Sequence, residues 1–268
     1  MRTAPIAVTA AVVLALFAPS APAQPGAKRL AAVFAHPDDE GSVAPVLAKY
    51  AREGAQVYLV IATDGAAGGR QTSIPVGPEL ARARAEEARC AAAALGIQPP
   101  ILLEFPDSKL GAYAEDPARL FAVTQRIHGE LQRLKPDALL TWGPDGGTGH
   151  PDHRLVSAVV TQLVRTGAPG MPDRLFYASI PADVMKVMSA GRGAPPLLIP
   201  DAKYLTMRVP FTPADGEAAG RSMACHKTQF PPEAVERATQ AATKAWNGAL
   251  SLAPAFGGPG GTDLFRAP

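Results

Sequence analysis

Cysteine is scarce in this chain of 268 residues, which contains only Cys90 and Cys225. Two cysteines cannot supply a four-cysteine zinc site or the several crosslinks of a small disulfide scaffold. We expect the two residues to be small buried thiols. A disulfide between them is the alternative if the chain reaches an oxidising compartment.

An excess of charge of one sign is also lacking. The formal net charge is +2, and no lysine or arginine block is dense enough to follow a phosphate backbone, so no nucleic-acid partner is expected. Charged residues make up 19% and hydrophobic residues 47%, which excludes extensive disorder and allows a sizeable core. The 25 glycines and 28 prolines show no collagen-like period, so they predict many loops.

The sequence has a single long apolar run, which lies near the N-terminus. Arg2 precedes an apolar run over residues 6–18, and a stretch of small residues follows up to Ala23. This pattern predicts a secretory signal peptide over residues 1–23 and an exported domain over residues 24–268, periplasmic or extracellular, with no stable membrane span after processing. An uncleaved anchor is the alternative, although the run is shorter than the roughly 20 residues that a span needs.

The rest of the chain alternates strands with helices. Short apolar runs predict strands, and the run at 57–62 has the unbroken apolar character of a strand covered on both faces. This alternation predicts a single α/β domain, Rossmann-like, with a mostly parallel sheet and helices on both faces. The predicted strands are residues 29–35, 57–62, 101–105, 138–142, 175–178 and 204–209; the predicted helices are 41–53, 79–95, 117–134, 155–165, 213–227 and 233–247, with surface loops at 191–200 and 257–261.

Polar side chains follow the first predicted strand directly. His36 precedes Pro37, which favours an extended backbone, so the strand delivers the imidazole at its carboxyl end, where ligands bind in open α/β sheets. Asp38 and Asp39 come next in a tight turn, so their carboxylates can diverge, one toward a metal and the other toward a water. The alternative is that these acids only cap the following helix. Helix capping would explain the acids but would not explain the presence of His36.

A second polar cluster follows the strand at 138–142. His150 and His153 enclose a Pro-Asp pair on a loop too rich in glycine to belong to a core. An isolated pair of this spacing is weak evidence. Together with His36, however, these histidines and a neighbouring aspartate fit a site of two histidines and one carboxylate with an open position for a ligand.

These motifs resemble those of one enzyme family. The run from Ala35 to Glu40 is similar to the signature of the PIG-L/LmbE-like zinc-dependent de-N-acetylases, and the run from His150 to His153 is similar to their second motif. Weaker similarities lie at residues 63–68, 84–87, 95–97, 107–108 and 226–229, so the resemblance spans about residues 30–229. The loop after Thr63 lacks a glutamate often found there.

The resemblance implies a role for each site residue. His36, Asp39 and His153 would hold Zn²⁺, Asp38 would be the general base, and His150 would face the substrate carbonyl. Zinc with three protein ligands lowers the pKa of a bound water to roughly 7. Asp38 could take a proton and return it to the leaving amine, and protonated His150 could stabilise the oxyanion.

The remaining polar residues receive weaker assignments. Arg70 and Asp107 could bind the substrate, although solvated loop residues look much the same in a sequence. Asp152 could orient a neighbouring histidine. Arg84 and Glu87 are expected to form an ion pair on a helix face. His226 is expected to be structural or to lie at the rim of the site.

The sequence thus favours an exported hydrolase that removes an N-acetyl or other N-acyl group from a small molecule, such as an amino-sugar conjugate. Two alternatives stay open. Two histidines and a carboxylate also suit Fe²⁺ in a non-haem oxygenase. A catalytically silent domain that binds metal or sugar would show the same ligands, although it would not need Asp38.

Overall fold

A computed structural model describes residues 26–179, 200–258 and 260–266. The predicted signal peptide and the predicted loop at 191–200 lie outside the described residues, except for Pro200. Both therefore stay predictions.

The core of the fold is one seven-stranded sheet with the order β3-β2-β1-β4-β5-β7-β6. The first five strands along the chain run parallel, and β7 pairs antiparallel with both β5 and β6. The strands are β1 (Arg29–Phe34), β2 (Gln56–Thr63), β3 (Ile101–Phe105), β4 (Ala138–Trp142), β5 (Leu175–Ala178), β6 (Met207–Pro210) and β7 (Ala249–Pro254).

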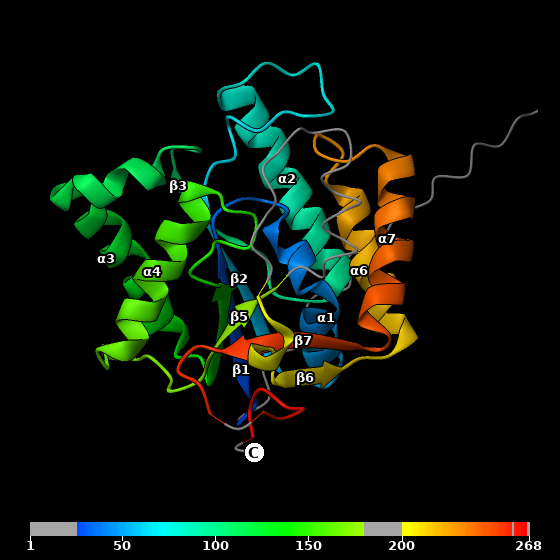
Figure 1. Ribbon diagram of the computed structural model, residues 1–268. Helices are drawn as coiled ribbons and strands as arrows, with labels where there is room; N and C mark the ends of the chain where they lie inside the picture. The colour runs from blue at the N-terminus through cyan, green and yellow to red at the C-terminus, as the bar shows by residue number, and fades with distance from the viewer. Residues whose placement is uncertain (1–25, 180–199, 259, 267–268) are drawn as a thin grey trace, which may run out of the picture.

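Helices cover both faces of this sheet (Figure 1). On one face the side chains of Leu30, Ala32 and Phe34 in β1 pack in a cluster with α1, α2, α6 and α7. The alternate side chains of β1 belong to a second cluster with α3 and α4 on the other face. The helices are α1 (Ala44–Arg52), α2 (Pro78–Leu95), α3 (Pro117–Leu134), α4 (Pro151–Arg165), α6 (Pro213–Cys225) and α7 (Pro232–Trp246), with short 3₁₀ turns η1 (Asp39–Ser42), η2 (Leu110–Glu115) and η3 (Ala202–Tyr204).

This architecture confirms the predicted α/β class with a mostly parallel sheet. The element boundaries differ at functional points. The α4 helix begins at Pro151 rather than Leu155, which places His153 in its first turn. The β6 strand begins at Met207 rather than at residue 204, because residues 202–204 form η3. The β7 strand was not predicted.

The expectation of two free thiols is wrong. Cys90 in α2 and Cys225 at the end of α6 form a disulfide, with their Cα atoms 5.8 Å apart. The pairing depends on the packing of α2 against α6, which brings together residues 135 positions apart in the chain. Within the described residues, no helix combines the length and the apolar character that crossing a membrane requires.

We expect the disulfide to stabilise the fold, because it closes a long loop and so restricts the unfolded chain. The double substitution Cys90→Ser/Cys225→Ser should lower the free energy of unfolding by about 2–4 kcal/mol in urea titrations. Reduced wild-type protein should match the double variant, and a reductant should leave the variant unchanged. An unfolding free energy equal to that of the oxidised wild type would contradict the prediction.

Candidate active site

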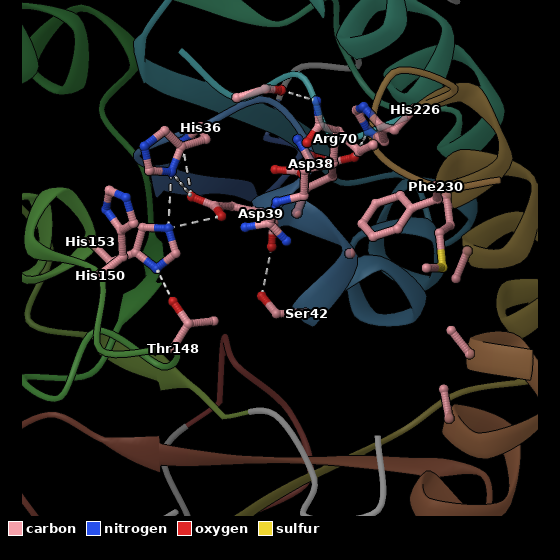
Figure 2. A pocket seen from close by; sticks show the side chains of 18 of the residues that line it. His36, Asp38, Asp39, Ser42, Arg70, Thr148, His150, His153, His226 and Phe230 are labelled. Carbon is pink, nitrogen blue, oxygen red and sulfur yellow. Dashed lines mark hydrogen bonds and ion pairs between the residues drawn. The ribbon is translucent and has the colours of Figure 1, made fainter. Parts of the chain in front are cut away.

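The polar residues that follow β1 and β4 meet at the carboxyl edge of the sheet (Figure 2). Because β1 and β4 are parallel neighbours, their ends place His36 and the first turn of α4 side by side. The rings of His36 and His153 lie 5.0 Å apart between centroids, and those of His36 and His150 lie 4.7 Å apart. The structure therefore brings all three histidines together.

The Asp39 carboxylate connects these two strand ends. Its Oδ2 accepts hydrogen bonds from the backbone N–H of Ala35 at 3.1 Å and of His36 at 2.9 Å, and from the Trp142 indole N–H at 3.2 Å. Its Oδ1 lies 3.1 Å from Nε2 of His153. One oxygen is thus saturated by donors, and the other faces the histidines.

The ring nitrogens of His36 and His153 are oriented by their outer neighbours. Nδ1 of His153 lies 2.8 Å from the Gly146 carbonyl oxygen, which can only accept, so this nitrogen carries the proton. Nε2 of His36 lies 3.1 Å from Oδ1 of Asp107 and 3.4 Å from Oδ2 of Asp152. The other two nitrogens, Nδ1 of His36 and Nε2 of His153, face each other at 3.0 Å. When both rings are neutral and their outer nitrogens carry the protons, the lone pairs of Nδ1 of His36 and Nε2 of His153 point toward the same space. Two ligands of one cation are arranged in this way.

The spacing of these atoms suits a tetrahedral metal ion. Ligand atoms bound at about 2.0–2.2 Å to one tetrahedral zinc lie roughly 3.3–3.5 Å apart. The separations of 3.0 Å between the two nitrogens and 3.1 Å between Nε2 of His153 and Oδ1 of Asp39 are close to this range. Nδ1 of His36 lies 3.7 Å from Oδ2 of Asp39. Among the described residues, two groups place possible ligand atoms all within 4.8 Å of one another: His36 with His150 and His153, and His36 with Asp107 and Asp152.

Charge at this cluster is shared between acids and histidines. Burial alone would lower the pKa of His36, but Asp107, Asp152 and Asp39 together raise it well above its usual range. Burial would raise the pKa of Asp39, but His153 and His36 hold it well below its usual range. The site therefore keeps Asp39 ionised, as a metal ligand must be.

Asp38 points away from Asp39, as the tight turn predicts. Its backbone has a φ of 108°, a left-handed conformation that is costly outside glycine and is typical of functional sites. Its side chain is 19% exposed, against 8% for Asp39, so Asp38 is the carboxylate that a substrate can reach. Burial raises the pKa of Asp38, and Arg84 opposes the shift.

His150 differs from the expected protonated residue. It occupies the N-cap of α4, where its Nδ1 accepts a hydrogen bond from the backbone N–H of Asp152 at 3.2 Å. Burial and the neighbouring His36 and His153 lower the pKa of His150. Because Nδ1 accepts, the neutral ring carries its proton on Nε2, and His150 remains a hydrogen-bond donor without a charge.

Of the two residues suggested for substrate binding, only Arg70 lies at the surface. Its side chain is exposed at the edge of the cavity that contains the site. Asp107 is buried, accepts a hydrogen bond from the backbone N–H of Ala67 at 3.0 Å and faces His36. Burial would raise the pKa of Asp107, but His36 lowers it to about 2. Asp107 and Asp152 both lie close to Nε2 of His36. The sequence suggested such an orienting role for Asp152 but not for Asp107.

The ion pair expected between Arg84 and Glu87 does not form, since each residue has other partners. Arg84 is 3% exposed and donates to the carbonyl oxygens of Gly65 at 3.1 Å and of Pro37. Its guanidinium lies 3.3 Å from Asp38 and 3.8 Å from Asp107. Arg84 is therefore a buried cation that ties the loops after β1, β2 and β3 together.

Two buried or half-buried glutamates, Glu87 and Glu40, hold the residues that follow α6 in place. Glu87 accepts hydrogen bonds from the backbone N–H and the hydroxyl of Thr228 at 2.8 and 2.7 Å. His226 is 1% exposed, and its Nε2 lies 2.6 Å from Oε1 of Glu40. The second oxygen of Glu40 accepts the backbone N–H of Asp38 at 3.1 Å. The expectation that His226 is structural is compatible with this contact. The role of Glu40 was missed, because it looks like a residue of the first helical turn.

A cavity of about 630 Å³ opens over these residues. Such a volume is typical of pockets for small molecules, which range over roughly 300–1,000 Å³. Its walls include Asp38 and the three histidines, the loop residues after β2 and β3, and residues of α6 and α7.

Comparison with known proteins defines the family. The family model described as PIG-L, GlcNAc-PI de-N-acetylase, matches residues 31–164, which is half of the chain. The chain belongs to this family. A relative from Nakamurella multipartita, a 1D-myo-inositol 2-acetamido-2-deoxy-alpha-D-glucopyranoside deacetylase, is 36% identical over 63% of this chain. The match covers 65% of that relative, so the chain spans less than two thirds of its length.

Solved structures share the fold at low sequence identity. The N,N'-diacetylchitobiose deacetylase from Pyrococcus horikoshii is 20% identical with a TM-score of 0.59, over 86% of this chain and 83% of that one. A 4-carboxy-2-hydroxymuconate hydratase from Pseudomonas putida is 16% identical with a TM-score of 0.56, over 86% and 97% of the two chains. The fold thus supports more than one reaction, so the reaction has to be inferred from the site.

We expect Arg84 to be essential for stability, because its removal leaves buried carboxylates and carbonyl oxygens without their cation. Arg84→Ala should lower the free energy of unfolding by about 3 kcal/mol or more. Arg82→Ala is the matched control, since Arg82 is exposed on the same helix and should change stability by less than about 0.5 kcal/mol. If both substitutions lowered the free energy of unfolding in urea by the same amount, Arg84 would contribute no more to stability than an exposed arginine.

Proposed function

We propose that this chain is a metal-dependent amidohydrolase that removes an N-acyl group, such as acetyl, from an amino-sugar conjugate. The observation that carries the proposal is that Nε2 of His153 lies 3.0 Å from Nδ1 of His36 and 3.1 Å from Oδ1 of Asp39, with Nδ1 of His36 3.7 Å from Oδ2 of Asp39, beside the accessible carboxylate of Asp38. Membership of the PIG-L family and the named activity of the Nakamurella relative support the same reaction.

The donor set favours zinc. Two imidazole nitrogens and one carboxylate oxygen are the ligands of many catalytic zinc sites, and the outer carboxylates on His36 are typical of the partners that orient a ligating histidine. His36, Asp39 and His153 would hold the ion. When bound, zinc supplies Lewis acidity, which makes water more acidic and polarises a carbonyl oxygen. Fe²⁺ suits the same ligands.

Asp38 and His150 would act on the substrate itself. Asp38 would take a proton from the attacking water and pass it to the amine nitrogen as the C–N bond breaks, because an amine leaves poorly unless it is protonated. Nε2–H of His150 would donate a hydrogen bond to the developing oxyanion. Arg84 would hold Asp38 in place from its far side.

The polar walls of the cavity suit a hydroxylated amine. The loops after β2 and β3 contribute Gly68, Arg70 and Ser108 to the cavity wall, and they offer a guanidinium, a hydroxyl and backbone groups to sugar hydroxyls. The named substrate of the Nakamurella relative carries an acetamido group on a glucopyranoside, which supports an amino-sugar conjugate as the substrate class.

We expect the purified chain to release free amine from N-acetylglucosamine conjugates and to stop when a chelator removes the metal. Adding Zn²⁺ back should restore the rate. Amine release can be followed with an amine-reactive fluorophore, and metal content by elemental analysis. Active protein without a stoichiometric metal ion would refute the metal site, whereas restoration by Fe²⁺ alone would change only the identity of the metal.

Two substitutions separate metal binding from proton transfer. Asp38→Asn keeps the shape of the side chain and removes its basicity, so kcat should fall by about 10²–10⁴ while the metal stays bound. His153→Ala removes a ligand atom, so metal content and activity should fall together. Steady-state kinetics and metal analysis on both variants test the assignment. Loss of metal from Asp38→Asn, or a nearly normal kcat, would show that Asp38 is not the base.

A further inference from the structure

The cavity over the site has a second, apolar arm. We call it the α6–α7 groove and define it by the residues of these two helices that line the cavity. Figure 2 shows Phe230 on the side of Asp38 and Asp39 opposite His150 and His153, toward this arm. The α6 helix contributes Gly216, Ala219 and Met223, and α7 contributes Ala238, Ala242 and Trp246.

The walls of this groove offer little to a sugar. Among its described lining residues, the polar side-chain groups are the hydroxyls of Thr239 and Thr243 and the buried indole N–H of Trp246, which has no hydrogen-bond partner. Beside the groove, Phe211 and Phe230 add aromatic surface to the cavity. A hydroxylated ring placed here would lose most of its hydrogen bonds to water, because these three groups can replace only a few of them, which is unfavourable. An alkyl chain loses nothing of this kind and gains from leaving water.

The groove reaches the reacting centre as well as the loop after β2, to which Gln229, the neighbour of Phe230, donates a hydrogen bond at the Gly68 carbonyl oxygen. Gly41 and Ser42 line the cavity and come two and three positions after Asp39 in η1, and α6 packs against η1. The contact of His226 with Glu40 fixes the end of α6 at the same place. The acyl carbon is the atom on which Asp38 and the metal ligands converge, so a chain attached to that carbon enters the groove at once. A chain attached to the far side of a sugar would start at least one ring away.

We propose that the α6–α7 groove binds the hydrocarbon chain of an N-acyl group longer than acetyl, so that the preferred substrate is a fatty N-acyl amino sugar. This inference rests on the function proposed above. The reaction is the same hydrolysis: water adds across the amide C–N bond, the acyl carbon leaves as a fatty carboxylate, and the nitrogen leaves as the free amine. An acetyl group would leave the groove almost empty.

The wild-type chain tests this directly through a series of N-acylglucosamines with acetyl, butyryl, hexanoyl and octanoyl groups. Each methylene that leaves water contributes a factor of up to about four. We therefore expect kcat/KM to rise by at least about tenfold from acetyl to hexanoyl. The octyl glycoside of N-acetylglucosamine, which carries its alkyl chain on the other side of the sugar, should show no comparable gain.

Substitutions locate the effect. Ala242→Phe fills the groove, and Thr243→Phe narrows it from its exposed rim, where folding is at little risk. Each should lower the hexanoyl-to-acetyl ratio of kcat/KM at least about fivefold and change the rate on N-acetylglucosamine less than about twofold. Ala224→Phe is the matched control, because Ala224 is exposed on α6 and does not line the cavity.

The outcomes separate this inference from the proposed function. Turnover of the acetyl substrate with no gain from longer acyl chains overturns the acyl groove and leaves the proposed function standing. A gain for the octyl glycoside instead of the acyl series assigns the groove to the other end of the substrate and overturns the acyl assignment. No amine release from any member overturns the proposed function, and this inference with it.

Discussion

The site depends on the two oxygens of Asp39. Three N–H donors, two from the residues that follow β1 and one from Trp142 in β4, saturate Oδ2 and hold the carboxylate in place, so Oδ1 faces His153. One of these donors is the Trp142 indole, whose ring also stacks on His153 at 4.9 Å. The loop between β4 and α4 is held against the same ring, since a Cβ at Gly147 would lie 2.3 Å from it. A single carboxylate thus fixes the relative positions of both strand ends and of the histidine that follows them.

The concentration of acids around this centre needs a compensating cation. Asp38, Asp39, Asp107 and Asp152 lie close together in a largely buried region, where uncompensated negative charge is costly. Arg84 supplies one positive charge from α2 and at the same time satisfies carbonyl oxygens of two loops. Protonated His36 would supply part of the rest when no metal is bound, and a divalent cation would replace that proton when it binds. The arrangement favours a cation between His36, His153 and Asp39, where two imidazole nitrogens and a carboxylate oxygen lie close together.

Sequence patterns predicted what depends on neighbouring positions and missed what depends on packing. Buried parallel strands are continuous apolar runs, so all five parallel strands, and the site residues that follow β1 and β4, were predicted. The β7 strand pairs antiparallel near the sheet edge, and its residues show no comparable run. Arg84 looked like half of a surface ion pair, because helical spacing shows which residues share a face but not which loops that face meets. The disulfide was missed for the same reason, as it joins two helices far apart in the chain.

The reacting residues and one wall of the cavity come from different parts of the chain, which explains how one fold can serve different substrates. Every residue assigned here to metal binding or proton transfer lies within residues 31–164, the part that matches the family model. The α6 and α7 helices lie outside that part, yet they form one wall of the same cavity. The Cys90–Cys225 disulfide and the contact of His226 with Glu40 fix the end of α6 relative to the reacting centre, and α7 packs against α6. Changes on the inner faces of these helices can therefore alter which acyl chain is accepted while the geometry of His36, Asp39 and His153 stays the same.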